Sequence, residues 1–420
     1  HLGMHLANLL KVSESLFVRQ CAGQALLKIA DYMTYAQRNE ITVELYNGLE
    51  IGDLQISKYV PDFLGRMILK LPPQELDEML YTIELGIRTA NYQVASSMIT
   101  TIGVMLENFY EFSSTFPGEE KKNAKRQLFM LYMMLKAYGH YNKELSRDAF
   151  RDIGRCIFHS SCMPQSQTDF LFSHCYKKIL VSLYENDEGT LDFYSNAAVL
   201  NHIYRYIAIH QFLAGGFRFP KHKKACFYPG TFDPFSVGHK AVARKIRDMG
   251  FEVYLALDEF SWSKHTQPRL MRRKIMNMSV ADEENIYPFP DDISINIANE
   301  ADICRLKELF HGKDRSLAFG SDVIENASAY KKTPTRDSIH TVNHIAFARE
   351  SQEHPKEAPQ KGYPITAGVI TLTLDKFYED VSSTRIRENI DLNRDISNLI
   401  DAVAQNFIYD HNLYLREPAY

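Results

Sequence analysis

The pattern of apolar residues changes near position 217, and this change constrains the fold more than any other feature of the sequence. Before it, apolar residues recur three and four positions apart, as in Leu6, Leu9 and Leu10, which is the spacing of one helix face. After it, short β-rich runs alternate with helical stretches, a pattern typical of an α/β domain with a parallel sheet. We therefore predict an all-α domain over residues 1–217 and an α/β domain over residues 218–420.

Four similar helical stretches recur along the first domain, over residues 18–33, 56–71, 92–109 and 146–160. By pattern alone, this recurrence resembles a HEAT-like or armadillo-like helical solenoid, and an irregular helical bundle explains it almost as well. We find no chemistry-bearing motif in this domain. We expect it to bind a protein partner along a concave helical face or only to brace the second domain.

The second domain begins after Gly215-Gly216 and a short basic run. Two stretches rich in proline and charge, residues 331–343 and 351–364, are predicted to be surface excursions. The sequence predicts five strands in this domain, over residues 225–228, 253–257, 317–319, 344–348 and 368–374.

Composition and charge exclude several classes of protein. The net charge of −4 is too small for a nucleic-acid-binding tail or a basic membrane surface. No apolar run approaches the ~20 residues that cross a bilayer, and the start has no signal-peptide pattern. The six cysteines are too sparse for a disulfide framework, so we expect a cytoplasmic protein. A first residue other than Met is typical of a fragment of a longer chain.

A loose group of thiols and imidazoles in the first domain could suggest a zinc site. Adjacent residues such as His174 and Cys175 rarely both bind one ion, and the surrounding sequence is helical. We interpret Cys156, Cys162 and Cys175 as buried thiols, and His159 and His174 as surface histidines. No protein metal site is predicted.

The first segment with chemical content runs from Phe227 to His239 and reads Phe-Tyr-Pro-Gly-Thr-Phe-Asp-Pro-Phe-Ser-Val-Gly-His. A short strand enters a glycine-containing turn and a helix follows, an arrangement that places a nucleotide at the end of the first strand beside a helix N-terminus. Gly230 lets the backbone approach a phosphate, and Gly238 lets the helix start lie against the ligand. His239 then directs an imidazole at a charge-gaining oxygen of the triphosphate.

The second segment reads Val-Ser-Ser-Thr-Arg-Ile-Arg and ends at Arg387. Hydroxyl residues before a helix are typical of an N-cap, whose exposed N–H groups can face an anion. Arg387 can turn back to the same anion because the guanidinium geometry suits phosphate. Taken alone, this segment is best explained as an ordinary capped helix.

Together the two segments resemble the Gly-Thr-Phe-Asp-Pro…Gly-His and Ile-Ser-Ser-Thr-x-Ile-Arg signatures of the nucleotidyltransferases that share the His-x-Gly-His motif. The nicotinate (or nicotinamide) mononucleotide adenylyltransferases are the most similar branch, and the resemblance covers about residues 224–416. It implies a Rossmann-like α/β fold. Ser236 replaces the first His of the motif, and the phosphopantetheine adenylyltransferases resemble this chain in having a hydroxyl residue there.

Further segments follow in the order of that family. The resemblance implies that Asp322 holds the acceptor's hydroxyl groups and that Tyr330, where the family has Trp, covers its ring. Arg273 and Arg349 match two more family positions and are assigned to the acceptor. Arg272 and Lys274 are interpreted as a solvated helix face. The chain's last helix and Asn412-Leu413-Tyr414 are similar to the family's C-terminal helix end.

The implied reaction is in-line displacement at the α-phosphate of ATP by the acceptor's phosphate, with pyrophosphate as the leaving group and no protein nucleophile. Mg²⁺ would bridge phosphate oxygens, mostly with water ligands. The resemblance assigns catalysis to His239, Arg387, Lys264 and Ser236. It assigns ATP binding to Gly230, Thr231, Phe232, Asp233, Gly238, Ser382, Ser383 and Thr384.

The acceptor that we expect is nicotinate mononucleotide, which would make the product the deamido precursor of NAD. Two sister activities remain open, adenylyl transfer to phosphopantetheine and cytidylyl transfer to a sugar or alcohol phosphate. A different class also remains open, in which the helical domain is a scaffold and the second domain binds a nucleotide without catalysis.

Overall fold

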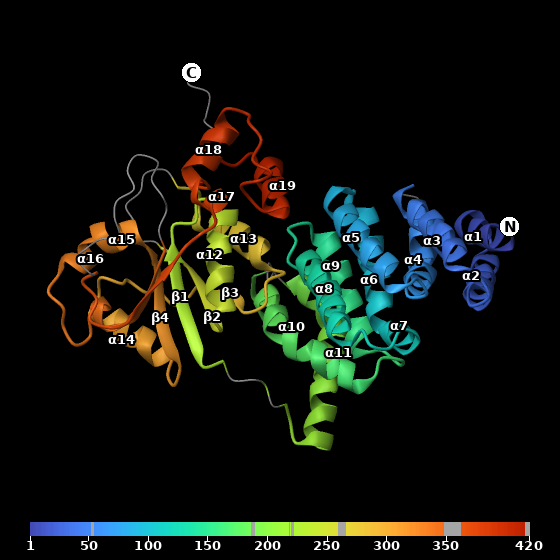
Figure 1. The fold of residues 1–420 in the computed structure, drawn as a ribbon, viewed down its shortest axis with the longest axis horizontal. Coiled ribbons are helices and arrows are strands. Elements are labelled where there is room, and N and C mark those ends of the chain that lie inside the picture. Colours follow the sequence, from blue (N-terminus) through green and yellow to red (C-terminus); the bar gives the residue numbers. More distant parts are fainter. Residues whose placement is uncertain are drawn as a thin grey trace. The chain divides into compact units, whose positions relative to one another are not determined.

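The computed structural model describes residues 1–51, 54–185, 190–217, 219, 222–258, 266–347 and 363–415. The chain divides into two units, His1–Phe219 and Pro220–Tyr420 (Figure 1). The first unit is helical and the second contains a parallel sheet, so the predicted fold classes are confirmed. Among the described residues, no helix combines the length and the apolar character that crossing a bilayer requires.

The first unit is built from helices whose starts are set by short polar side chains. Ser15, Asn91 and Asn142 each accept a hydrogen bond from a backbone N–H of the helix that follows, and Thr34 forms a capping box with Gln37. The elements are α1 (Leu2–Val12), α2 (Leu16–Ala30), α3 (Tyr35–Glu50), α4 (Leu54–Ile68), α5 (Pro73–Thr89), α6 (Tyr92–Glu107), α7 (Phe109–Thr115), α8 (Glu120–Tyr138), α9 (Lys143–Ile153), the π-helix η1 (Gly154–Phe158), α10 (Gln165–Glu185) and α11 (Thr190–Ala214).

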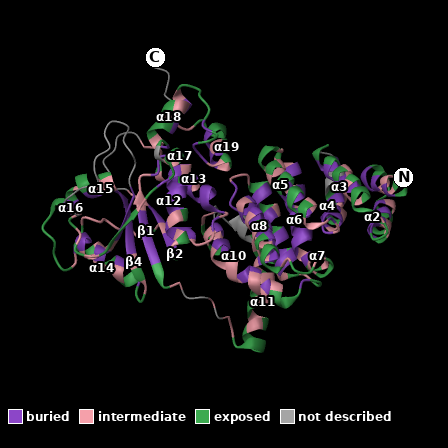
Figure 2. Ribbon diagram, in the orientation of Figure 1, coloured by how far each residue is buried: buried purple, intermediate pink, exposed green. Residues whose placement is uncertain are grey.

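A single apolar core runs through this unit. Leu26, Leu45, Met98 and Phe150 are fully buried members of it, and the buried faces of successive helices follow one another in Figure 2. α1 packs against α2, α3 against α4 and α8 against α9. Whether these pairs form a HEAT-like repeat stays a prediction.

The second unit contains a six-stranded parallel sheet in the order β3-β2-β1-β4-β5-β6. The sequence predicts five of these strands and misses β3, whose three residues are too few to show a pattern. β1 and β2 are buried along most of their length, as expected for strands covered on both faces. The strands are β1 (Lys224–Gly230), β2 (Phe251–Leu257), β3 (Ile286–Pro288), β4 (Asp314–Gly320), β5 (Asn343–Phe347) and β6 (Val369–Leu372).

This strand order creates a switch point between β1 and β4. From β1 the chain steps outward through β2 to β3, and then returns to the other side of β1 to add β4, β5 and β6. In open α/β sheets, ligands bind at the C-terminal ends of the strands beside such a point. α12 and α13 lie on one side of the sheet and α14 on the other (Figure 1). The helices are α12 (Val237–Asp248), α13 (Arg269–Val280), α14 (Glu300–Leu309), α15 (Ser321–Asn326), α16 (Ser328–Lys331), the 3-10 helix η2 (Ile339–Thr341), α17 (Lys376–Glu379), α18 (Ser383–Asp391) and α19 (Ala402–Asp410).

One of the predicted surface excursions belongs partly to the core. Residues 331–337 are largely exposed, but Ile339 and His340 in η2 are buried. The prediction is wrong for these residues because the Ser338 hydroxyl bonds to the Thr335 carbonyl oxygen and closes a turn, which directs Ile339 into the cluster beside β4 and β5. The other excursion, 351–364, lies almost wholly outside the described residues.

Candidate nucleotide site

The N-terminus of α12 is a capping box between Ser236 and His239. The Ser236 hydroxyl accepts from the His239 backbone N–H at 3.3 Å, and the Ser236 N–H donates to His239 Nδ1 at 3.0 Å. Because Nδ1 is the acceptor, the proton of the neutral imidazole lies on Nε2. Ser236 is only 1% exposed. Its hydroxyl therefore caps α12 and helps to orient His239, and its contact with phosphate stays a prediction.

The turn between β1 and α12 is shaped by the ring of Phe232. This residue has a φ of 45°, in the left-handed region that non-glycine residues rarely adopt. A Cβ added at Gly230 would lie 2.6 Å from the Phe232 ring, so glycine is required there to admit the ring. Phe232 is buried and its ring centroid lies 5.0 Å from that of His239, in an edge-to-face arrangement. Phe232 thus supports the imidazole from the protein side.

Three side chains hold consecutive parts of this turn through its carbonyl oxygens. Arg272 donates to the Thr231 oxygen at 2.6 Å and Arg387 to the Asp233 oxygen at 2.5 Å. The Ser383 hydroxyl donates to the Pro234 oxygen at 2.9 Å. The turn is therefore fixed by α13 and α18 together.

Arg272 corrects the sequence analysis. It is 6% exposed, so its interpretation as part of a solvated helix face is wrong. Lys274, which shares that interpretation, is half-buried. The physical reason is that Arg272 satisfies two backbone carbonyls inside the fold, those of Thr231 and Gln267. A spacing of basic residues along a helix cannot reveal such distant backbone acceptors.

The second sequence segment lies directly against the first. Ser382 caps α18 by accepting from the Arg385 N–H at 3.1 Å, and Thr384 accepts from Arg387 at 3.2 Å. A Cβ added at Gly238 would lie 3.3 Å from the Val381 carbonyl oxygen. Gly238 therefore allows α12 and α18 to begin side by side. We call residues 230–239 and 382–387 together the motif junction.

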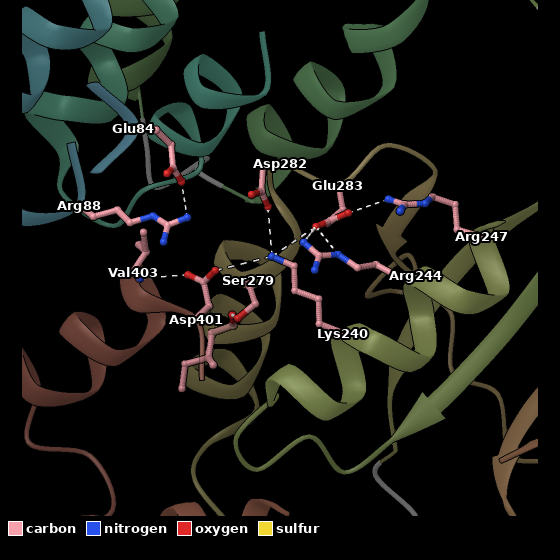
Figure 3. Close-up of polar contacts among 11 residues, drawn as sticks. Glu84, Arg88, Lys240, Arg244, Arg247, Ser279, Asp282, Glu283, Asp401 and Val403 are labelled. Atoms are coloured by element: carbon pink, nitrogen blue, oxygen red, sulfur yellow. Dashed lines mark hydrogen bonds and ion pairs between the residues drawn. The ribbon is translucent and has the colours of Figure 1, made fainter. Parts of the chain in front are cut away.

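A group of charges centred on the buried Lys240 and Glu283 fastens α12 behind the motif junction (Figure 3). Lys240 lies 3.4 Å from Asp282, 3.4 Å from Glu283 and 3.7 Å from Asp401. Arg244 also pairs with Glu283. Burial by itself raises the pKa of Glu283, but its bond with Arg244 and the charge of Lys240 hold that pKa below the ordinary value. α12 is thus tied to the end of α13 and to the start of α19.

A cavity of about 460 Å³ opens at the same edge of the sheet, within the usual size of small-molecule sites. We call it the apolar pocket, because most of its lining is aliphatic or aromatic, including Phe289 and Phe319. Gly230 and Thr231 also line it, so the apolar pocket and the motif junction meet at these two residues. Its other lining side chains come from β2, α13, α15, α16 and the 289–298 segment.

Three charged residues line the apolar pocket, Arg269, Arg273 and Asp258, and Asp291 outside the lining pairs with both arginines. Arg273 donates to the Phe289 carbonyl at 3.0 Å and lies 3.6 Å from Asp291. Arg269 pairs with the same carboxylate at 2.5 Å. Arg273, which the sequence analysis assigns to the acceptor, lines the apolar pocket, and Arg269 lines it as well.

The other predicted acceptor residues are placed differently. Asp322 is exposed in the first turn of α15, between the pocket residues Phe319 and Val323 along the chain. Tyr330 is buried in the core, and its hydroxyl donates to His344 Nε2 at 2.9 Å. Burial lowers the pKa of His344 to about 4, so this ring is neutral and its Nδ1 donates to the Val342 carbonyl at 2.7 Å. The Tyr330 side chain therefore packs in the core and does not line the apolar pocket.

Some predictions fall on residues that the structure does not describe, namely Lys264 and Arg349. Their roles stay predictions. Over the described ranges, no group of three or more His, Cys, Asp or Glu side chains could hold a metal ion. Cys156 and Cys175 are buried, as interpreted from the sequence. The interpretation is wrong for Cys162, which is exposed because it follows the end of η1, where its thiol contacts the polar side chains of Ser160 and Asn108.

Comparison with known proteins gives a family for part of the chain. Residues 227–389 match the family model described as cytidylyltransferase-like. By sequence, no curated protein matches the chain. Among solved structures, Plasmodium falciparum nicotinic acid mononucleotide adenylyltransferase complexed with NaAD is 18% identical, with a TM-score of 0.37, over 46% of this chain and 98% of that one. The same enzyme complexed with APC is 18% identical, with a TM-score of 0.36, over 46% and 98%.

The family match and the parallel sheet define the class of the second unit. Residues 227–389 begin in β1 and end in α18, so the match spans both halves of the motif junction. The second unit therefore contains a nucleotidyltransferase-like domain, whose residues 227–389 are similar to the cytidylyltransferase-like family model. The structural similarities are too distant to assign a substrate.

Proposed function

We propose that the second unit transfers an adenylyl group from ATP to the phosphate of a small acceptor and releases pyrophosphate. The observation that carries this proposal is the meeting of the motif junction and the apolar pocket at Gly230 and Thr231. A nucleotide at the motif junction and an acceptor in the apolar pocket would approach each other there. Such positioning, with charge stabilisation, is what phosphoryl-type chemistry requires of a protein.

On the nucleotide side, we assign the charge-stabilising role to His239 and Arg387. The Ser236 N–H fixes the His239 tautomer, so that Nε2–H can donate to an oxygen that gains charge as pyrophosphate leaves. Arg387 has five N–H donors, of which some can reach phosphate while others hold Asp233 and Thr384. The capped start of α18 adds backbone N–H groups, and Lys264 remains an expected third cation.

We propose that the metal ion arrives with the nucleotide rather than being held by the protein alone. Mg²⁺ bound to the triphosphate would neutralise part of its charge.

On the acceptor side, we propose nicotinate mononucleotide. A flat aromatic ring suits a cavity lined by Phe289 and Phe319, and its carboxylate suits Arg269 and Arg273 at the wall. Asp322 would accept hydrogen bonds from ribose hydroxyls at the rim. Tyr330 is not part of this proposal, because its hydroxyl and ring are packed against His344.

A second candidate is cytidylyl transfer from CTP to a small phosphate-bearing alcohol, which the description of the matching family favours. Incubating the whole chain with Mg²⁺ and either ATP or CTP, against nicotinate mononucleotide, phosphopantetheine and glycerol phosphate, separates the candidates. We expect pyrophosphate with ATP and nicotinate mononucleotide. Pyrophosphate only with CTP would replace our proposal by the second candidate. Nucleotide binding with no pyrophosphate from any pair would favour a non-catalytic module.

A further inference from the structure

The C-terminal segment returns to the first sequence motif through one side chain. The Tyr414 hydroxyl donates to Asp233 Oδ1 at 2.8 Å across 181 positions of sequence. Tyr414 follows the last helix, α19, whose end is closed by a hydrogen bond from the Leu413 N–H to the Ile408 carbonyl at 3.0 Å. Burial raises the pKa of the Tyr414 phenol, and the charge of Asp233 raises it further, so the hydroxyl stays a donor at every physiological pH.

Asp233 is a buried carboxylate, 3% exposed, with partners from three parts of the chain. Besides the Tyr414 hydroxyl, its Oδ1 accepts from the Gln267 N–H at 3.2 Å. Its Oδ2 lies 3.8 Å from Arg387 Nη1, and that same Nη1 donates to the Asp233 carbonyl oxygen at 2.5 Å. Asp233 therefore stands directly between Tyr414 and Arg387.

The ion pair between Asp233 and Arg387 is long, and this has a consequence for phosphate binding. An arginine in a close bidentate pair with a carboxylate commits its donors to that partner. Here the carboxylate is shared with the Tyr414 hydroxyl and the Gln267 N–H, which satisfy one of its oxygens. A carboxylate satisfied in this way attracts the Arg387 guanidinium less. More of the N–H donors of Arg387 therefore stay available for an anion.

From this we infer that Tyr414 is a positioning residue of the nucleotide site, which acts on Arg387 through Asp233. The inference rests on the proposed function and names a part of the site that lies outside both sequence motifs. Without the hydroxyl, Asp233 Oδ1 keeps only the Gln267 N–H at 3.2 Å, and the carboxylate attracts more strongly the Arg387 guanidinium, whose Nη1 lies 3.8 Å from Oδ2. Arg387 would then turn from the triphosphate to the carboxylate.

The test is Tyr414→Phe in the whole chain, which removes one oxygen atom and keeps the ring. Tyr409→Phe is the matched control, because Tyr409 belongs to α19 and is 44% exposed. ATP binding in the presence of Mg²⁺ is measured by calorimetry, and the KM values for ATP and acceptor by pyrophosphate release. We expect Tyr414→Phe to weaken ATP binding by roughly 10- to 150-fold, the range for a lost hydrogen bond to a charged group, with the acceptor's KM within about twofold. Tyr409→Phe should match the wild type.

A thermodynamic cycle with Arg387→Ala distinguishes positioning from general loosening of the fold. If Tyr414 acts through Arg387, adding Tyr414→Phe to Arg387→Ala should change ATP binding less than about twofold. If Tyr414→Phe fails to fold, Asp233→Asn tests the same contact from its other side. This variant should weaken ATP binding to a similar degree.

The outcomes separate this inference from the proposed function. Wild-type ATP affinity in folded Tyr414→Phe, or full additivity with Arg387→Ala, overturns the role of Tyr414 and leaves the proposed function intact. A wild-type chain that binds no nucleoside triphosphate overturns both.

Discussion

The motif junction and the apolar pocket share Gly230 and Thr231, yet they are built in opposite ways. At the motif junction, polar side chains bind one another and the carbonyl oxygens of one turn, so each residue has a defined partner. The apolar pocket is lined mainly by aliphatic and aromatic side chains from several elements, with Arg269 and Arg273 at its wall. The nucleotide side of the proposed site is therefore defined by specific hydrogen bonds, whereas the acceptor side is defined by the shape of its apolar lining.

The largest expected effect belongs to the motif junction. His239→Ala should lower turnover by about 100- to 1000-fold, corresponding to ~2.7–4 kcal/mol, because it removes a donor to charge that develops in the transition state. ATP should still bind. Pyrophosphate release under saturating substrates is the measurement, and His311→Ala, at an exposed histidine, is the control. Unchanged turnover would remove His239 from the mechanism.

The next prediction concerns the core behind the apolar pocket, where His344 accepts from Tyr330. Because burial holds the pKa of His344 near 4 instead of 6.5, the unfolded chain binds the extra proton between these values. The contribution of the neutral His344 to the free energy of unfolding is therefore fully present above pH 6.5. It falls by about 3 kcal/mol in total as the pH decreases to about 4. Urea unfolding followed by the fluorescence of Trp262, the chain's single tryptophan, measures this.

The comparison variant for that prediction is His344→Gln, which cannot titrate. Its stability should be lower at pH 7 but should change less between pH 6.5 and 4. An identical pH profile in the two proteins would show that another group causes the acid sensitivity, and that Tyr330 is not held by a neutral imidazole.

Asp322→Ala tests the rim of the apolar pocket. If Asp322 binds ribose hydroxyls, the variant should use the acceptor roughly 5- to 150-fold less well, from the ~1–3 kcal/mol of a lost hydrogen bond, with the KM for ATP nearly unchanged. The KM values for both substrates and the melting temperature are measured together. A lower melting temperature with an unchanged acceptor KM would mean that Asp322 only supports the start of α15.

Ser236→Ala should have the smallest effect and it sharpens the assignment of Ser236 as a cap. Loss of an N-cap hydroxyl costs about 1 kcal/mol of stability. Turnover should fall less than about tenfold, because alanine keeps one of the two Ser236 groups that contact His239 Nδ1, the backbone N–H, and loses only the hydroxyl. Thermal unfolding and turnover are compared in one preparation. A loss as large as that of His239→Ala would instead make the hydroxyl a phosphate ligand.

The sequence predicts the fold well where periodicity is long. The helical unit and five of the six strands follow from apolar spacing, whereas β3 has only the residues Ile286–Pro288 and leaves no pattern. The sequence analysis does not predict the burial of η2, whose flanking residues are charged. The turn that buries Ile339 depends on the Ser338 hydroxyl and not on hydropathy.

The candidate site divides in the same way. His239, Arg387 and Ser383 lie together as their two motifs suggest, because those motifs encode a strand, a turn and two helix starts. Arg272 and Tyr414 could not be placed, since their partners lie 41 and 181 positions away and are chosen by the tertiary fold. Tyr330 has the residue type of a ring-stacking position, but the fold gives its hydroxyl to His344.

The most direct test of the account follows the α-phosphate itself. The whole chain is incubated with Mg²⁺, nicotinate mononucleotide and ATP labelled at the α-phosphate, and the products are separated. We predict that the label moves into a dinucleotide while unlabelled pyrophosphate accumulates in equal amount. Label that stays in ATP, or that appears only as free AMP, would contradict the claim that the motif junction and the apolar pocket form an adenylyl-transfer site.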